Sequence, residues 1–406
     1  MADLICDFCG KDVKSVSKIF SAQKAHICNE CVGTCFDVMH KEELKKEKKE
    51  FQRGLSVPTK LKEHLDNYVI GQEEAKKVLA VALYSHYKRI DKPIYKNVEI
   101  EKSNIMLIGP TGSGKTLLAK SLAKIMDVPF AIADSTALTE AGYVGEDVES
   151  ILSRLLASAD FDVERAQKGI IYIDEIDKVA NKSESATSGR DVSGEGVQQG
   201  LLKILEGGEV YVPVKGSRKS AGADTILFDT THVLFICGGA FVGLLGDDEK
   251  SKKFKHKTMG FLNKENKDED DLKEIESKDL ISFGLIPEFI GRIPVIATLN
   301  PLTTDDLIRV LEEPKNAIIK QYQALFELDG VDLEFTKEAL VEIATMAEEK
   351  GVGARGLRGI IEKIMLPLQY ELPARDNVEK CIITKEFITK EEDVTLIYEE
   401  KKSENG

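Results

Sequence analysis

About a quarter of the way along the chain, a glycine-rich loop lies between a strand-like and a helix-like segment, and this feature constrains the fold most. The apolar run Ile105 to Ile108 before the loop is typical of a buried strand, and a helix-forming run extends from Leu117 to Met126. The loop fits the pattern GxxxxGK[ST], which in this context predicts a phosphate-binding loop. Its residues are Gly109, Pro110, Thr111, Gly112, Ser113, Gly114, Lys115 and Thr116.

The residue types of this loop suit a nucleoside triphosphate and a metal ion. Glycines let the backbone turn tightly, so that several N–H groups point at phosphate oxygens, and the helix N-terminus adds positive potential. Lys115 can reach the β- and γ-phosphates, and the Thr116 hydroxyl can ligate Mg²⁺. We therefore expect ATP and Mg²⁺ here, with Leu117 included in the binding segment. The alternative, a glycine-rich turn without nucleotide, is disfavoured by the flanking elements.

A second apolar strand, Ile170 to Asp174, is followed directly by Glu175. Beside a phosphate loop, the end of this strand would bring Asp174 close to Mg²⁺ and Glu175 close to the γ-phosphate. Asp174 would then support the metal, and Glu175 would orient or deprotonate the attacking water. A strand that merely ends in charged residues is the alternative. Together with the phosphate loop, the two carboxylates predict ATP hydrolysis and not binding alone.

Four cysteines near the start of the chain form two CxxC pairs, Cys6 with Cys9 and Cys28 with Cys31. This spacing suits four thiolates around one tetrahedral Zn²⁺ ion, and such a small block needs the metal to fold. His26 and Cys35 are nearby rival ligands. Because an all-sulfur site has no open position, we expect a structural zinc site. The remaining Cys237 and Cys381 lie in apolar strands and are interpreted as core residues.

The composition narrows the class of protein. The chain has 406 residues, of which 42% are hydrophobic, and a net charge of −14. Such a charge argues against general nucleic-acid binding, which needs lysine and arginine to neutralise phosphates. No apolar run is long enough to span a membrane, and the start, Met1 to Leu4, lacks the pattern of a secretory signal. We therefore expect a cytoplasmic protein without membrane or nucleic-acid partners.

Alternating apolar runs and helical patterns predict an α/β fold, a parallel sheet covered by helices. The strands expected in this sheet are Ile105–Gly109, Phe130–Ala133, Ile170–Asp174 and Val233–Cys237. Between Lys41 and Arg53, ten of thirteen residues are charged, which indicates a solvated linker. We expect a zinc-binding domain at 1–41, a charged linker at 42–57, a large domain at 58–302 and a small domain at 303–406.

The small domain is expected to combine helices with short strands. Thr303 or Thr304 can cap a long helix that reaches about Leu328, and Thr336 can cap a second one. The second and third helices are expected at Lys337–Lys350 and Ala354–Leu372, and the strands near Cys381–Thr384 and Val394–Tyr398.

Five motifs occur in the order found in the ClpX family of AAA+ ring unfoldases, and the chain resembles that family from about residue 4 to residue 385. They are, in chain order, the phosphate loop, the Gly142–Glu146 segment, the Ile173-Asp174-Glu175 strand end, Phe289-Ile290-Gly291-Arg292 and Gly353-Ala354-Arg355. The Cys₄ block is also a signature of the family. Taken alone, the Gly142–Glu146 segment would be interpreted as an aromatic residue packed under a loop. The resemblance implies an AAA+ large domain, a small α/β lid domain and a preceding Cys₄ zinc domain.

The resemblance also implies further residues of the nucleotide site. The segment Val69-Ile70-Gly71-Gln72 would line the adenine pocket, and Arg292 would be the arginine finger that reaches the neighbouring subunit's nucleotide. Arg355 would be the second-sensor arginine that couples the nucleotide to the angle between the two AAA+ domains. Without the resemblance, each arginine could equally be a surface ion pair. The segment Phe235–Gly239 lacks the polar residue that many AAA+ proteins use as a first sensor.

Three loops and a tripeptide are implied to contact proteins. Tyr143 and Val144 would form the first pore loop, Arg190 would belong to the second, and Arg218 with Lys219 would lie in the loop that meets substrate tags. This last loop departs from the family at Ser220-Ala221. The tripeptide that docks into a ClpP-type peptidase would be Met259, Gly260 and Phe261.

The function expected from these features is that of an ATP-dependent protein unfoldase and chaperone. Six copies would form a ring, translocate protein substrates through its pore and deliver them to a ClpP-type peptidase, while the zinc domain would receive adaptors. Two rival functions are an AAA+ motor that acts on nucleic acid and a zinc-dependent scaffold that uses ATP only to assemble.

Overall fold

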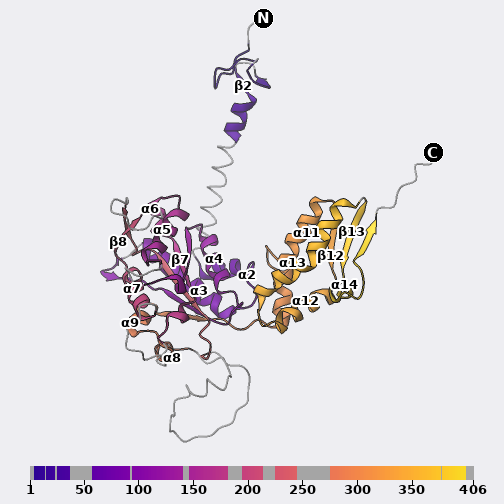
Figure 1. The fold of residues 1–406 in the computed structure, drawn as a ribbon. Helices are drawn as coiled ribbons and strands as arrows, with labels where there is room; N and C mark the ends of the chain where they lie inside the picture. The colour runs from indigo at the N-terminus through magenta and orange to yellow at the C-terminus, as the bar shows by residue number, and fades with distance from the viewer. Residues whose placement is uncertain are drawn as a thin grey trace, which may run out of the picture. The chain divides into compact units, whose positions relative to one another are not determined.

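The central sheet of the protein has five parallel strands in the order β11-β5-β10-β7-β6, as seen in a computed structural model (Figure 1). The structure describes residues 4–13, 15–22, 25–36, 57–91, 94–139, 146–181, 194–213, 225–244, 275–375 and 377–398. These residues fall into two compact units that divide after Lys60.

The first unit contains a small hairpin and one turn-rich segment. Strands β1 (Ile19–Ser21) and β2 (His26–Cys28) pair antiparallel, and Ile5 bridges Asp12 across the loop that holds the first CxxC pair. Residues 29–36, which follow β2, are helical. The short elements of this unit bury little apolar surface, and its buried cysteines are Cys6 and Cys28.

The five-stranded sheet is formed by long apolar runs. Its strands are β5 (Ile105–Ile108), β6 (Phe130–Asp134), β7 (Ile170–Asp174), β10 (Leu234–Gly239) and β11 (Val295–Thr298). The first four of these confirm the strands expected from sequence. Every residue of β5 and β10 is buried, as expected for central strands of a parallel sheet that is covered on both faces.

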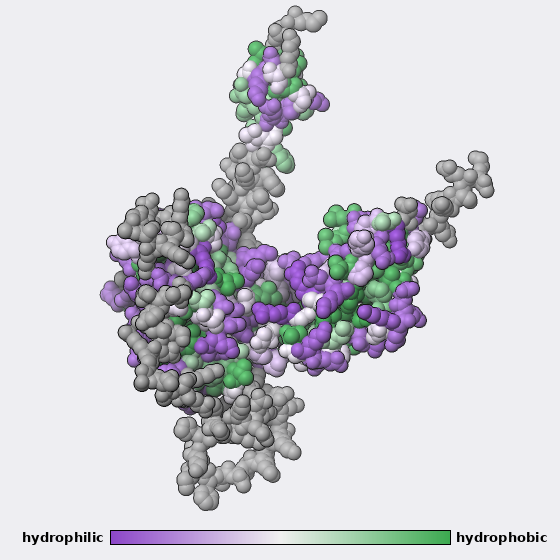
Figure 2. Space-filling model, viewed as in Figure 1, coloured by the Kyte–Doolittle hydropathy of each residue, from purple (hydrophilic) through white to green (hydrophobic). Residues whose placement is uncertain are grey.

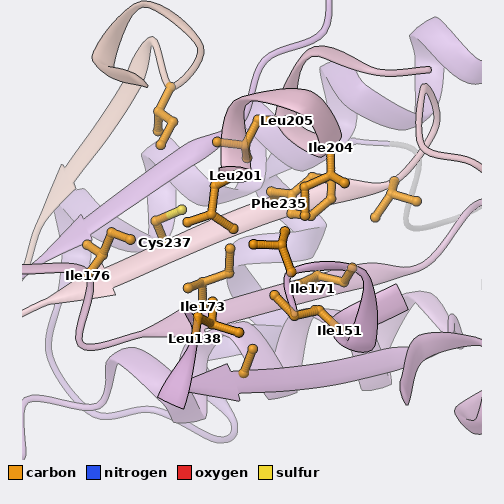
Figure 3. Packing of buried hydrophobic residues seen from close by; sticks show 14 of the residues in the cluster. Leu138, Ile151, Ile171, Ile173, Ile176, Leu201, Ile204, Leu205, Phe235 and Cys237 are labelled. Carbon is orange, nitrogen blue, oxygen red and sulfur yellow. The ribbon is translucent and has the colours of Figure 1, made fainter. Parts of the chain in front are cut away.

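Helices cover the sheet on its two faces. The larger ones are α3 (Glu73–Asp91), α4 (Lys115–Met126), α5 (Glu149–Ser158) and α7 (Glu195–Glu206). Ile171 and Ile173 of β7 pack with Leu201 and Leu205 of α7 in one hydrophobic cluster, as Figure 3 shows. Because side chains alternate along a strand, the residues between them face the opposite side, where α4 contacts β7 and β10.

Smaller elements fill the connections of this part of the chain. Two of them are hairpins, β3 with β4 and β8 with β9. The bounds are α2 (Pro58–Asp66), β3 (Ile94–Tyr95), β4 (Val98–Glu99), η1 (Ser135–Ala137), α6 (Val163–Ala166), η2 (Ile176–Val179), β8 (Glu209–Pro213), β9 (Thr225–Asp229), α8 (Ser277–Phe283) and α9 (Pro287–Gly291).

A second hydrophobic cluster lies in the residues after Leu302. It joins several helices to a three-stranded sheet of order β12-β13-β14. The elements are α10 (Thr304–Glu312), α11 (Ile318–Leu328), β12 (Asp332–Phe335), α12 (Lys337–Glu349), α13 (Ala354–Glu371), η4 (Leu372–Ala374), β13 (Val378–Ile383), α14 (Lys385–Thr389) and β14 (Thr395–Tyr398).

The expected long helix from Thr303 to Leu328 is wrong, because the segment forms α10 and α11 with a break between them. Pro314 lies in the break and explains it, since proline has no N–H to donate and its ring clashes with the carbonyl group four residues earlier. The expected caps are confirmed. Thr303 accepts a hydrogen bond from the Asp306 N–H in a capping box, and Thr336 accepts one from the Ala339 N–H.

Figure 2 shows hydrophilic side chains over much of the visible face, with apolar patches between them. Each helix among the described residues is too short or too polar to cross a membrane.

Candidate nucleotide site and zinc centre

The phosphate loop joins the buried strand β5 to helix α4, as the sequence predicts. Gly112 and Gly114 have φ angles of 83° and 100°, in the left-handed region that glycine adopts without strain. Gly109 is needed for a different reason, because a Cβ atom there would lie 2.7 Å from Leu299 Cβ. Since the N-cap residue Gly114 has no side chain to cover the first turn of α4, the N–H groups of that turn remain available to an anion.

Lys115 is held over this loop. Its Nζ donates hydrogen bonds to the carbonyl oxygens of Gly109 at 2.6 Å and of Pro110 at 2.9 Å. Burial lowers the pKa of Lys115, while the charge of Asp174 opposes this shift. A phosphate group would be a stronger acceptor than these two carbonyl oxygens and would compensate the desolvated ammonium group.

The sheet brings Asp174 to the same edge as the phosphate loop, because the carboxyl ends of parallel strands meet there. The Thr116 hydroxyl donates a hydrogen bond to Asp174 Oδ2 at 3.1 Å. A hydroxyl and a carboxylate oxygen at this distance, in a half-buried position, are hard oxygen donors of the kind that Mg²⁺ prefers. These residues therefore fit a magnesium ion.

Glu175 projects from the same strand end with its side chain exposed. Its backbone has a φ of 57° and a ψ of 31°, a left-handed conformation that costs a non-glycine residue about 1–2 kcal/mol. Ser135 is buried and stabilises this conformation, because its hydroxyl donates to the Glu175 carbonyl oxygen at 2.8 Å. An exposed carboxylate on a strained backbone, beside a phosphate loop, suits a catalytic role.

Val69 and Ile70 are buried and precede a left-handed turn at Gly71 and Gln72. Val69 lies next to the phosphate loop, since a Cβ at Gly114 would be 3.9 Å from Val69 Cγ1. Gln72, the last residue of this segment, binds a distant part of the chain. Its side-chain amide donates to Asn300 O at 2.8 Å, and its Oε1 accepts from Asn300 N at 2.8 Å.

The two candidate arginines lie in different settings. Arg355 lies in the first turn of α13, and the backbone before that helix approaches the phosphate loop, because a Cβ at Gly112 would lie 2.8 Å from Val352 O and 3.1 Å from Gly353 Cα. Arg292 follows α9 and is exposed, and its guanidinium Nε donates to Glu206 Oε1 at 3.0 Å. An exposed ion pair of this kind contributes little stability and exchanges readily for another partner.

The predicted pore, tag and docking residues lie outside the described residues. They are Tyr143, Val144, Arg190, Arg218, Lys219, Met259, Gly260 and Phe261.

The four predicted zinc ligands come together in the first unit. The sulfur atoms of Cys6, Cys9, Cys28 and Cys31 all lie within 4.8 Å of one another. The Sγ atoms of Cys6 and Cys31 are 3.9 Å apart, and those of Cys9 and Cys28 are 3.6 Å apart. A tetrahedral ion with Zn–S bonds of about 2.3 Å separates its sulfur ligands by about 3.8 Å. The donor set therefore fits Zn²⁺.

Backbone N–H groups support this cluster. Cys28 N donates to Cys6 Sγ at 3.2 Å, and Cys31 N donates to Cys28 Sγ at 3.4 Å. Burial raises the pKa of the Cys6 thiol, but N–H groups of Cys9, Cys28 and Phe8 outweigh it and lower the pKa to about 6. The Cys9 side chain and burial raise the pKa of Cys31. Four thiolates so close together need a cation to be charged at once. Cys35 and His26 do not belong to this cluster of described side chains.

Three family models match the chain. The ClpX C4-type zinc finger matches residues 4–41, the AAA domain of the Cdc48 subfamily matches residues 100–296, and the C-terminal D2-small domain of ClpB protein matches residues 302–384.

Curated relatives match almost the whole chain. A protein of Wolinella succinogenes called ATP-dependent Clp protease ATP-binding subunit ClpX 2 is 53% identical over 407 aligned positions, which cover 100% of both chains. ATP-dependent Clp protease ATP-binding subunits ClpX of Borrelia duttonii and Borrelia recurrentis are each 51% identical over 389 positions. Those two alignments cover 94% of this chain and 90% of each relative.

Replacing one zinc ligand should release the metal. We expect the wild type to carry one zinc ion per chain and Cys31→Ser to lose it, because a serine hydroxyl is a poor substitute for a thiolate ligand of Zn²⁺. Cys35→Ser is the matched control and should retain the metal. Zinc content after gel filtration measures both. Loss of zinc from Cys35→Ser, or a zinc-free wild type, would contradict the assignment.

Proposed function

Because the chain belongs to the ClpX family of ATP-binding subunits of the Clp protease, we propose that it unfolds proteins with the energy of ATP hydrolysis. It is an ATPase, and its cofactors are ATP, Mg²⁺ and Zn²⁺. We further propose that six copies form a ring, that the ring translocates protein substrates through its pore, and that it delivers them to a ClpP-type peptidase.

The observation that carries the proposal is the meeting of the phosphate loop and the acidic strand end. Thr116 and Asp174 are joined by a hydrogen bond at the carboxyl edge of the sheet, and Glu175 extends from the same strand into solvent. A protein that only binds ATP needs the loop but not an exposed carboxylate beside it. This arrangement supports hydrolysis as the source of mechanical work.

Each residue of the site has a role that follows from its position. Lys115 and the N–H groups at the start of α4 would hold the phosphates, while Thr116 and Asp174 would hold Mg²⁺. Mg²⁺ bound there would withdraw negative charge from the phosphate oxygens. Glu175 would accept a proton from the attacking water, and its exposed side chain leaves room for that water.

The proposed ring completes this site. Arg292 is exposed at the end of α9, and in the ring it would exchange its partner Glu206 for the nucleotide of a neighbouring copy. Arginine suits a role across a subunit boundary because it is always charged and presents a rigid fork of donors. Arg355 lies in α13, close in sequence to the glycine that approaches the phosphate loop, which supports a role in sensing the nucleotide.

We propose four parts for the chain, a zinc-binding domain at 1–41, a linker at 42–57, a large domain at 58–302 and a small domain at 303–406. The separate hydrophobic clusters before and after Leu302 support the last boundary. By the family resemblance, Tyr143 and Val144 would grip substrate, Arg190, Arg218 and Lys219 would contact it, and Met259-Gly260-Phe261 would dock the peptidase. The zinc domain would receive adaptors.

Glu175→Gln tests the ATPase site. We expect this variant to bind ATP as tightly as the wild type but to hydrolyse it at least about 100-fold more slowly, because an amide cannot accept the proton of water. Equilibrium binding of ATP and steady-state phosphate release measure the two quantities. Glu164→Gln, at an exposed glutamate of α6, is the control. Unfolding of a tagged fluorescent protein by Glu175→Gln at the wild-type rate would refute the proposal.

Tyr143→Ala tests the proposed grip on substrate. We expect ATP hydrolysis within about twofold of the wild type and a loss of at least about tenfold in the unfolding rate, because alanine removes the aromatic contact surface. Loss of fluorescence from a tagged substrate measures unfolding. The control is Tyr95→Ala, which removes an exposed tyrosine from β3. Unimpaired unfolding by Tyr143→Ala would show that the pore loop is misassigned.

Deletion of Met259–Phe261 tests peptidase docking. We expect unfolding of the tagged substrate to persist while its degradation with an added ClpP-type peptidase falls at least about tenfold, because the apolar anchors of the contact are removed. Deletion of Lys267–Glu269 from the same polar segment is the matched control. Peptide release in the presence of the peptidase measures degradation. Equal degradation by both deletion variants would reject the docking role.

A further inference from the structure

Tyr172 lies in the middle of strand β7 and is fully buried. Ile171 and Ile173 point into the cluster shown in Figure 3, so Tyr172 faces the opposite side of the sheet, the side that α4 covers. Asp174 is two residues further along and shares this face. The Tyr172 hydroxyl donates a hydrogen bond to Asp174 Oδ1 at 3.0 Å. A residue that the sequence presents as part of an apolar strand therefore contacts the candidate magnesium ligand.

The neighbouring strand β10 leaves the space that this phenol occupies. A Cβ atom at Gly238 would lie 2.0 Å from the Tyr172 hydroxyl oxygen and 2.7 Å from its Cζ. Strands β10 and β7 are in parallel register, with Ile236 opposite Tyr172 and Cys237 opposite Ile173. Gly238 and Asp174 are the next residues along the two strands, so they lie at neighbouring positions of the sheet. Any side chain at this position of β10 would displace the phenol.

Asp174 is thus held at both of its oxygens. Its Oδ2 accepts from Thr116 at 3.1 Å, and its Oδ1 accepts from the Glu175 N–H at 3.0 Å as well as from Tyr172. The Tyr172 hydroxyl is the donor in this hydrogen bond, because an ionised carboxylate can only accept. A carboxylate fixed in this way can present its remaining lone pairs in one direction.

We propose that Tyr172 is a positioning residue that orients Asp174 toward Mg²⁺. In this arrangement, Gly238 is the complementary residue, because its missing side chain makes room for the phenol. The inference deepens the proposed function and depends on Asp174 as the residue that supports the metal. Tyr172 acts through Asp174 and does not itself contact the phosphates.

Tyr172→Phe removes the hydroxyl and leaves the ring in place. Loss of an outer-shell partner of a metal ligand typically costs about 10–100-fold in metal affinity, so Tyr172→Phe should raise the Mg²⁺ concentration for half-maximal nucleotide binding about tenfold or more. The measurement is a Mg²⁺ titration of the binding of a fluorescent, non-hydrolysable ATP analogue. ATP hydrolysis at low Mg²⁺ should fall in parallel and recover at saturating Mg²⁺.

Tyr87→Phe is the matched control. Its phenol donates to Lys168 O at 3.0 Å, before the start of β7 and therefore at the opposite end of the strand from Asp174. Both substitutions remove one phenol hydrogen bond, so both should lower the thermal unfolding midpoint by similar amounts. Only Tyr172→Phe should shift the Mg²⁺ titration.

Gly238→Ala approaches the same contact from the other strand. The added methyl group must push the Tyr172 hydroxyl away from Asp174, so the Mg²⁺ titration should shift in the same direction as for Tyr172→Phe. Gly359→Ala is its control, because a Cβ at Gly359 in α13 would meet no atom within 4 Å. If Gly238→Ala fails to fold, Tyr172→Phe alone decides the matter.

The outcomes separate this inference from the proposal on which it rests. Asp174→Asn should strongly raise the Mg²⁺ concentration for half-maximal nucleotide binding. A titration of that variant that matches the wild type would overturn the metal site itself. If Asp174→Asn shifts the titration but Tyr172→Phe coincides with Tyr87→Phe, the positioning role of Tyr172 is wrong while the metal site stands.

Discussion

The hydrogen bond between Thr116 and Asp174 is the contact on which the nucleotide site depends, because it joins two segments that the sheet places on either side of β10. Thr116 belongs to the helix after β5, and Asp174 ends β7. Strand β10 lies between these two strands, and open α/β sheets bind ligands at the carboxyl ends of their strands. The glycines of the phosphate loop and the strained Glu175 are both arranged around this pair.

The zinc unit follows a different physical logic from the rest of the chain. Phe8 is 71% exposed and Phe36 is 66% exposed, so two of its largest apolar side chains contribute little to a core. The buried apolar side chains among the described residues of this unit are those of two cysteines, Cys6 and Cys28. A metal bound to four thiolates can supply the folding free energy that a small core cannot. The donors to these sulfurs come from its own backbone, as in the N–H of Cys28.

The parts predicted well from sequence are those where one residue pattern has a single physical explanation. The continuous apolar runs of β5 and β7 suit only buried strands, and the two CxxC pairs have a spacing that suits one metal ion. Strand β11 was not predicted, because it is a short sheet-edge strand whose side chains are partly exposed. The prediction of one long helix after Thr303 was wrong, although the sequence contains the cause. Pro314 is incompatible with an uninterrupted helix.

Contacts between distant segments could not be predicted in this way. Gln72 binds the backbone of Asn300, and Arg292 pairs with Glu206, yet neither pair has a local sequence pattern. The hydrogen bond from Tyr172 to Asp174 could not be predicted either, because an aromatic residue inside an apolar strand is normally a core residue. The one available signal was Gly238, a glycine inside a buried strand, which often marks the close approach of another group.

Two glycines, Gly112 and Gly353, lie where the phosphate loop approaches the residues after Leu302. Gly112 lies in the phosphate loop, and any Cβ there would clash with Val352 O. Gly353 has a φ of 55° and directly precedes α13, in which Arg355 lies. Because the two backbones approach so closely, a change in the phosphate loop cannot be absorbed by side chains between them. Such direct backbone contact is a physical reason for the start of α13 to respond to the nucleotide.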